Sequence, residues 1–188
     1  KGIFAPNSKS LERLRDYAAF CEKLSVIVLT RRSFSPIIEG NLSVFATGSC
    51  CRIKYTFDAL RLAKKIIAGG MDLVMTQDPF DTGHIGWLIK RRFKILWQCQ
   101  AHTDFLSPYF WRESLGNKLR VLTAGFLLRR ADGIRVVSKR IKDSLAAIGY
   151  PQKIITVLPI MVDVEKINAA SVSVNLKEKY SQFEFLIL

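Results

Sequence analysis

The feature that most constrains the fold is the alternation of short apolar runs with longer amphipathic segments along almost the whole chain. Runs rich in β-branched residues predict buried strands at 25–30, 42–47, 72–77, 94–99, 132–138 and 153–159. Helical spacing of apolar residues predicts helices at 10–24, 57–70, 83–92, roughly 112–130 and 139–149. This alternation predicts an α/β fold, namely a doubly wound, mostly parallel Rossmann-like sheet with helices on both faces.

The composition fits one domain with a sizeable core. The chain has 188 residues, 49% of them hydrophobic and 24% charged, which excludes a disordered chain. No apolar run approaches the ~18 residues that a membrane span needs. The first ten residues, KGIFAPNSKS, do not have the pattern of a signal peptide, and because the first residue is not Met we expect a piece of a longer chain.

The cysteines give no sign of a metal site. They lie scattered at Cys21, Cys50, Cys51 and Cys99, with no CxxC pair and no Cys/His cluster. We therefore expect no zinc, and reduced thiols in a cytosolic protein.

The charge is strongly positive. Lys and Arg number 29 against 16 Asp and Glu, a net charge of +13, and the excess is concentrated at 90–94, 129–130 and 139–142. This balance favours an anionic partner, such as nucleic acid, an anionic membrane surface or a phosphorylated ligand. A solvated basic surface with no specific partner is the alternative.

Polar residues follow the predicted strands, where open α/β sheets bind their ligands. The stretch QAHTDFLSPYF (100–110) places His102 and Asp104 directly after the strand at 94–99. His102 could exchange a proton near neutral pH or hydrogen-bond a hydroxyl or phosphate, although a purely structural hydrogen bond is the alternative. Asp104 could orient the imidazole, accept from a hydroxyl, or cap a turn.

Two further strand ends carry candidate residues. After the strand at 72–77, Asp78 and Gly83 precede or open a helix, and Gly83 would let a ligand approach the backbone N–H groups. After the strand at 132–138, Ser138 is a natural N-cap and Arg140 could meet an anion or remain solvated. Neither GxGxxG nor GxxxxGK[ST] occurs, which argues against a conventional NAD domain and a P-loop.

Three consecutive aromatic residues, Tyr109 to Trp111, lie close to several cations. One helix face cannot bury all three. We expect some of them to line the ligand crevice or to rest at a membrane interface, and at least one to pack in the core.

Four segments in a fixed order resemble the N-terminal domain of family 4 glycosyltransferases, the retaining, nucleotide-sugar-dependent enzymes of the GT-B fold. They are DLVMTQDPFDTG, QAHTDFLSPYF, ADGIRVVSKRIKDSL and ITVLPIMVD, and the resemblance covers nearly the whole chain. It implies two Rossmann domains that face a cleft. The N-terminal domain would mostly bind the acceptor, and a C-terminal domain, absent here, would bind the nucleotide sugar.

The resemblance also implies roles for residues. His102 would be catalytic, near the transferred sugar, and the acceptor- or sugar-binding residues would be Asn7, Ser8, Asp78, Gly83, Asp104, Ser138 and Arg140. Asn7 and Ser8 stand where the family has a glycine-containing loop near the donor phosphates. Catalysis would be metal-independent and retain anomeric configuration, with no cofactor, because the nucleotide sugar is a substrate.

The resemblance divides the chain into an acceptor-binding Rossmann-like domain, 1–163, and a linker with the first strand of a truncated second domain, 164–188, where that strand starts in FEFLIL. The first strand of the family's N-terminal domain is expected to be absent or reduced, and the chain alone is expected to be inactive.

The expected partners are a nucleotide-sugar donor, a glycan or lipid-linked acceptor of cell-envelope polysaccharide or glycolipid synthesis, and an anionic membrane surface, with no nucleic acid. The expected location is the cytoplasm, at the inner face of the cell membrane. The alternatives are a non-catalytic Rossmann-like module that binds a nucleotide or nucleic acid, and a non-functional fragment.

Overall fold

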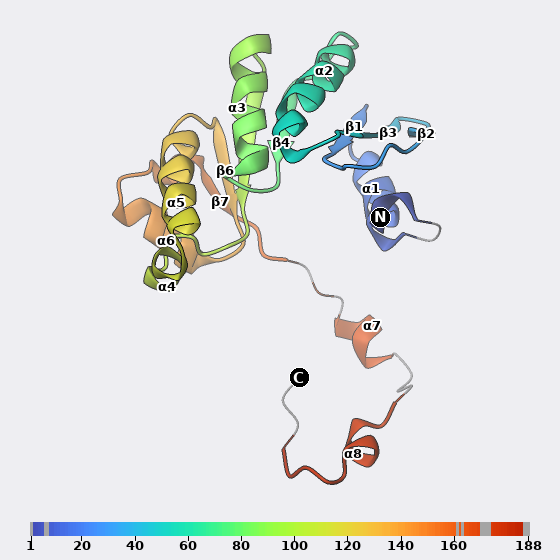
Figure 1. Cartoon of the computed structure of the whole chain (residues 1–188), viewed down its shortest axis with the longest axis vertical. Helices are drawn as coiled ribbons and strands as arrows, with labels where there is room; N and C mark the ends of the chain where they lie inside the picture. The colour runs from blue at the N-terminus through green and yellow to red at the C-terminus, as the bar shows by residue number, and fades with distance from the viewer. Residues whose placement is uncertain (1, 6–7, 161, 163, 170–173, 186–188) are drawn as a thin grey trace. The chain divides into compact units, whose positions relative to one another are not determined.

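A computed structural model describes residues 2–5, 8–160, 162, 164–169 and 174–185 (Figure 1). The chain divides into two compact units, Lys1–Leu158 and Pro159–Leu188. The predicted α/β fold is confirmed and lies in the first unit. Asn7, one of the predicted sugar-binding residues, lies outside the described residues.

The first unit contains two sheets. In the three-stranded sheet, of order β1-β3-β2, β1 (Leu24–Val28) is parallel to β3 (Leu42–Ala46), and β2 (Ile37–Glu39) is antiparallel to β3. The four-stranded sheet is parallel throughout and has the order β4 (Leu73–Thr76), β5 (Leu96–Ala101), β6 (Gly133–Val136) and β7 (Ile155–Val157). Among the described residues no strand pairs with the second edge of β1 or of β4. The single sheet that the sequence predicts is therefore divided in two.

Helices cover both faces of the three-stranded sheet. The α-helices of the first unit are α1 (Lys9–Ala18), α2 (Tyr55–Ile67), α3 (Asp81–Phe93), α4 (Pro108–Glu113), α5 (Leu115–Leu128) and α6 (Lys139–Ala147). Neighbouring residues of a strand point to opposite faces. Val26 of β1 accordingly packs in the cluster that contains Leu11 of α1, whereas Ile27 packs in the cluster formed by α2 and α3.

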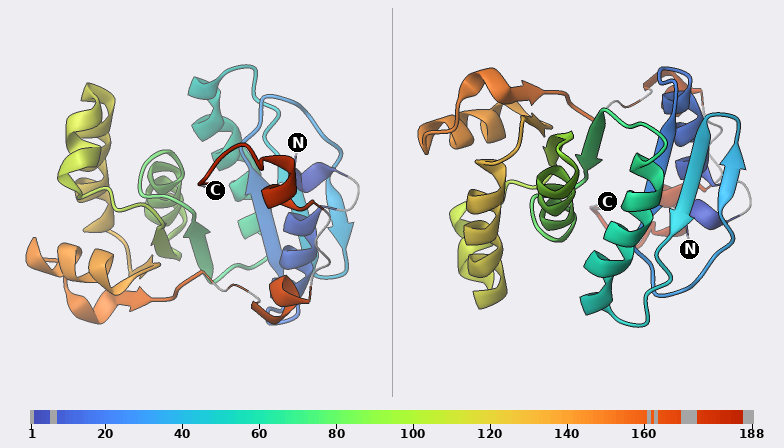
Figure 2. Two further views of the ribbon diagram at one scale, coloured as in Figure 1. Left: turned by 90° about the horizontal axis from the view of Figure 1, so that it is seen from below. Right: turned by 90° about the horizontal axis from the view of Figure 1, so that it is seen from above.

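The α2–α3 cluster joins the two sheets. Its buried residues come from α2 and α3, which lie side by side, and both Ile27 of β1 and Val74 of β4 pack against them (Figures 1 and 2). One apolar layer thus covers the neighbouring strands of the two sheets, although no ladder hydrogen bonds connect them.

Among the described residues, helices cover only one face of the four-stranded sheet. Trp97, Cys99 and Ala101 of β5 pack with residues of α5 and α6 in the main core. The strand order advances in one direction from β4 to β7, and right-handed crossovers then place the connecting helices on the same face. On the opposite face Leu73, Met75 and Leu96 are 44%, 50% and 58% exposed.

Two predicted helices differ from the structure, and particular side-chain hydrogen bonds account for both differences. The segment predicted at 10–24 ends at Ala18, because the Asn41 side chain donates to the carbonyls of Ala18 and Cys21, 2.8 and 2.6 Å away. The segment predicted at 112–130 is interrupted at Ser114, which is extended at φ −160° and caps α5 by accepting from the Asn117 N–H at 3.1 Å.

Short elements complete the chain. Three 3-10 turns, Gly2–Phe4, Arg52–Lys54 and Gln152–Ile154, lie in the first unit, and α7 (Val164–Asn168) and α8 (Leu176–Lys179) lie in the second. Of the predicted strand at 183–188, residues 183–185 have no strand pairing, which a strand needs to satisfy its backbone groups, and 186–188 lie outside the described residues.

Candidate functional site

The predicted site residues that follow β4, β5 and β6 share one edge of the four-stranded sheet. The parallel register pairs Thr76 with Cys99 and Ala101 with Val136, so the carboxyl ends of these strands lie together. Asp78, His102, Asp104 and Ser138 follow these ends directly. This edge is therefore the candidate site.

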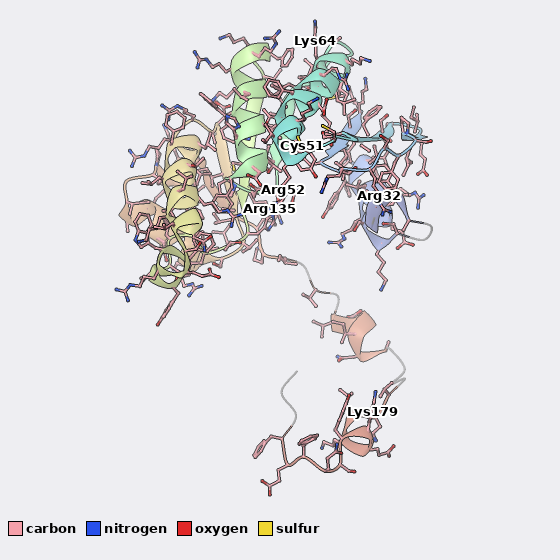
Figure 3. The ribbon with its side chains drawn as sticks, in the orientation of Figure 1. Arg32, Cys51, Arg52, Lys64, Arg135 and Lys179 are labelled. Atoms are coloured by element: carbon pink, nitrogen blue, oxygen red, sulfur yellow. The ribbon has the colours of Figure 1, made fainter. Side chains whose placement is uncertain are left out.

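His102 belongs to a hydrogen-bonded group on the open face of the sheet. Gln100 and Arg135 are register partners on β5 and β6, so their side chains lie on the same face. The Gln100 Oε1 is 3.0 Å from the His102 Nε2 and accepts from the Arg135 Nη1 at 3.0 Å (Figure 3 labels Arg135). Gln100 lies on β5 and is only 5% exposed, so the group is anchored in the sheet rather than in a loop.

The contacts of Gln100 fix the tautomer of His102. A guanidinium can only donate, so the Gln100 atom that faces Arg135 is the oxygen. That oxygen can only accept, which places a hydrogen on Nε2 of His102. In the neutral ring Nδ1 is then the acceptor, and no hydrogen bond to it is found among the described residues. It can receive a hydrogen bond or a proton from a hydroxyl group.

The surroundings favour the neutral form of this imidazole. Burial lowers the pKa of His102, and the positive charge of Arg135 lowers it further, while the carboxylate of Asp78 acts in the opposite direction. The Arg135 Nη2 also lies 3.4 Å from the Leu158 carbonyl oxygen, but its Nε is buried without a hydrogen-bond partner in the described residues. A buried donor of this kind favours an oxygen-rich ligand nearby.

Asp78 is engaged in a tight turn before α3. Its Oδ1 accepts from the N–H groups of Phe80 and Thr82, at 2.8 and 3.3 Å, and its Oδ2 accepts from the Thr82 hydroxyl at 2.7 Å. A Cβ on Gly83 would approach the Asp78 carbonyl oxygen to 2.9 Å. Gly83 thus allows close packing of this turn, and Asp78 holds it in shape beside His102.

Asp104 and Arg140 form an ion pair across the site edge. The Arg140 Nη2 lies 3.0 Å from the Asp104 Oδ2, and their side chains are 77% and 18% exposed. Ser138 caps α6 by accepting from the Ile141 N–H at 3.3 Å. The loop after β5 is thereby tied to the first turn of α6.

Ser8 is not brought to this edge. Its hydroxyl caps α1 by accepting from the Leu11 N–H at 3.3 Å, and α1 packs on the three-stranded sheet.

The aromatic stretch divides as the sequence suggested. Phe110 packs against the main core and stacks with Phe80, with ring centroids 6.1 Å apart. Tyr109 and Trp111 remain 86% and 38% exposed.

Gln100 and Arg135 are the site residues that sequence reasoning missed. Both carried a signal. Gln98 and Gln100 alternate with apolar residues in the run LWQCQA, which is typical of a strand with one polar face, and Arg135 interrupts the apolar run GIRVV. Treating both runs as continuously apolar concealed that face.

Neither a metal cluster nor a membrane span is found among the described residues. No three His, Cys, Asp or Glu side chains come together as a metal site would require. None of the helices is long and apolar enough to cross a bilayer.

A mostly parallel α/β domain with polar groups gathered beyond its strand ends is a Rossmann-like domain. The chain belongs to glycosyltransferase family 4, because the model of that family matches residues 5–166. The resemblance that the four sequence segments indicated is thus confirmed.

A solved structure shows the same fold at low sequence identity. The S. aureus MnaA–UDP co-structure has a TM-score of 0.50 and 15% identity, over 85% of this chain and 51% of that one. UDP-GlcNAc 2-epimerase from Methanocaldococcus jannaschii has a TM-score of 0.46 and 16% identity, over 64% of this chain and 32% of that one. The chain thus spans from about a third to about half of these proteins. A comparison with curated proteins gives no match.

Proposed function

We propose that this chain is the acceptor-binding half of a glycosyltransferase that moves a sugar from a nucleotide-sugar donor to a saccharide or lipid-linked acceptor. Family membership supports the reaction class. The observation that carries the proposal is the His102–Gln100–Arg135 group at the carboxyl edge of the sheet, in which Gln100 places the hydrogen on Nε2 and leaves Nδ1 to accept from a hydroxyl. The lowered pKa of His102 favours this neutral form.

The residues around His102 take positioning and binding roles in this proposal. His102 contacts the transferred sugar, and Gln100 fixes its ring. Asp104 and Arg140 offer an acceptor and a donor group to hydroxyls of the acceptor substrate, and Arg140 could leave its partner at little cost because it is largely exposed. Asp78 and Gly83 act through the turn that they form, and Ser138 through the helix that it caps. Ser8 and Asn7 stay predicted contacts of the donor side.

The donor would be held mainly by a second domain. The second unit of the chain would lead into it, with residues 164–188 as linker and first strand. UDP in the MnaA co-structure supports a nucleotide sugar as donor. In this proposal the reaction retains anomeric configuration and needs no metal or cofactor. This chain alone is inactive, and the protein lies in the cytoplasm in contact with an anionic membrane.

Ring NMR of the two histidines tests the site directly, because His84 provides a control within the same chain. His84 lies on α3 with its ring 6.0 Å from that of Trp87, outside the hydrogen-bonded group. In the protein with its donor domain, titration with UDP-glucose, UDP-GlcNAc, GDP-mannose and methyl glycosides should shift the His102 signals and leave the His84 signals in place. If none of these probes moves His102, the site assignment is wrong.

Kinetics of the protein with its donor domain test the chemistry. His102→Ala should lower the transfer rate at least about tenfold, equivalent to about 1.4 kcal/mol. Lys64→Ala, on the exposed side of α2, serves as the control and should leave the rate unchanged (Figure 3). The anomeric configuration of the product, read by NMR, decides between retention and inversion.

A non-catalytic module that binds nucleic acid is the second candidate, favoured by the net charge of +13. It predicts binding to mixed oligonucleotides whose affinity falls steeply with salt, with a slope that reflects several phosphates. If the protein binds oligonucleotides in this way and shows no sugar transfer that depends on His102, this candidate is favoured over the transferase.

A further inference from the structure

The outer face of α5 carries an apolar stripe that no other described part of the chain covers. Its residues are Leu115, Leu119, Leu122 and Phe126, which are 81%, 66%, 63% and 46% exposed. At 3.6 residues per turn these positions fall within an arc of about 60° and extend about 16 Å along the helix. The opposite side of α5 packs in the core through Ala124, Leu127 and Leu128. The α5 stripe is therefore an apolar face in addition to the one that the fold buries.

An aromatic and cationic cluster closes one end of the α5 stripe. The Phe126 ring lies 5.5 Å from that of Trp87 in an edge-to-face arrangement, and the Arg130 guanidinium lies 3.4 Å from the Phe126 centroid. The Arg91 guanidinium lies 5.8 Å from the Trp87 ring. The aromatic body with cations at its rim is the arrangement that the membrane interface favours.

Beyond this cluster the surface forms a basic hollow of about 760 Å³ between the ends of α3 and α5. Its lining includes five cations, Lys90, Arg91, Lys94, Arg129 and Arg130, and one carboxylate, Asp132. Among the described residues only Lys90 is paired with that carboxylate, at 2.8 Å. The other four cations favour anionic groups.

At the other end the α5 stripe reaches the candidate site. Because α4 and α5 follow the loop after β5, Leu115 lies toward the edge that carries His102, and the exposed Tyr109 and Trp111 of α4 precede it. The Lys118 Nζ lies 6.0 Å from the Trp111 ring. The apolar face thus connects the site edge with the basic hollow.

We propose that the α5 stripe and the basic hollow dock the protein on an anionic lipid bilayer, with α5 lying along the surface. The stripe enters the boundary between headgroups and acyl chains, and the hollow takes lipid phosphates. The cations of the hollow match lipid phosphates, and the exposed leucines match acyl chains. Nucleic acid would satisfy the cations but offers the leucines no apolar partner, so a bilayer is the occupant that fits both. The docking places the site edge beside the membrane. The inference deepens the membrane contact of the proposed function by naming the surface that makes it, and it rests on that function in giving a lipid-linked acceptor access to His102.

Co-sedimentation of the full chain with vesicles tests the docking. Wild-type protein should bind vesicles of phosphatidylcholine with phosphatidylglycerol, and bind phosphatidylcholine alone weakly. The double variant Leu119→Glu/Leu122→Glu should lower the partition coefficient at least about tenfold. The control Ile53→Glu/Phe57→Glu changes two apolar residues that are 81% and 70% exposed elsewhere and should bind as wild type does.

A matched pair of charge variants tests the hollow. Arg91→Glu/Arg129→Glu should lower binding to phosphatidylglycerol vesicles at least about tenfold, whereas Lys64→Glu/Lys65→Glu on α2 should have a much smaller effect. Equal losses in both pairs, or equal binding of wild type to both vesicle types, would overturn the proposal.

Two further measurements distinguish membrane docking from self-association. In wild-type protein, brominated lipids should quench the fluorescence of Trp87 and Trp111, and that of the buried Trp97 far less. This measurement uses no variant, so it does not depend on whether a variant folds. A wild-type dimer that Leu119→Glu/Leu122→Glu converts to monomer would overturn the docking and make the stripe a contact between copies. Transfer to a free saccharide should be unchanged in the docking variants, so loss of docking and loss of the proposed function can be distinguished.

Discussion

Gly86→Ala should severely destabilise the sheet that carries the candidate site. Gly86 lies in α3 where that helix crosses β4 and β5. An added Cβ would lie 2.4 Å from the Trp97 Nε1 and 2.6 Å from the Thr76 Cγ2. Neither neighbour can withdraw, because Trp97 is 0% and Thr76 6% exposed, and the indole donates to the Thr76 hydroxyl at 3.0 Å.

The magnitude follows from three terms. Alanine should gain about 1 kcal/mol over glycine from helix propensity. Overpacking should cost about 1–3 kcal/mol. Separating the indole from Thr76 leaves a buried N–H without an acceptor, at about 1–3 kcal/mol. The steric and hydrogen-bond terms exceed the helical gain, so we expect a net loss of about 3 kcal/mol in the free energy of unfolding.

Urea unfolding followed by circular dichroism measures this difference. Gly125→Ala is the matched control, because its Cβ would meet only the Tyr150 Oη, at 3.9 Å. That variant should be as stable as wild type or more stable by up to about 1 kcal/mol. The reasoning is refuted if Gly86→Ala unfolds within about 0.5 kcal/mol of wild type.

Three other predictions concern the site and the core. Burial and, next, the charge of Arg135 lower the pKa of His102 below the unfolded value of 6.5. The stability that His102 contributes is therefore complete above pH 6.5 and is lost as the pH falls through the folded pKa. Arg135→Gln should raise the His102 pKa in an NMR titration. Burial raises the pKa of Cys99 to about 12, so a thiol reagent should label the exposed cysteines in native protein and label Cys99 only in denaturant. Asp104→Ala removes an ion pair whose Arg140 is 77% exposed, so it should lower the free energy of unfolding by at most about 1 kcal/mol, and a larger loss in thermal unfolding would contradict a surface ion pair.

The strand ends could be predicted because local patterns define them. The change from an apolar run to polar residues at 100–104 placed His102 just beyond the predicted strand at 94–99, and β5 extends two residues further, to Ala101. The break between α4 and α5 was missed because it depends on the extended backbone of Ser114 within a segment of helical spacing. The division of the sheet was missed because strand periodicity does not say which edges pair.

Sequence alone predicted the order of the main strands and helices and the parallel pairing of the four-stranded sheet, because periodicity and the handedness of crossovers follow from local patterns. It missed β2, which pairs antiparallel with β3. Only the tertiary structure decided that Gln100 meets Arg135, 35 residues away, and thereby holds His102. It also decided that the leucines of α5 remain exposed. Periodicity identifies the residues that share a face, but whether a second element covers that face depends on how the distant parts of the chain pack.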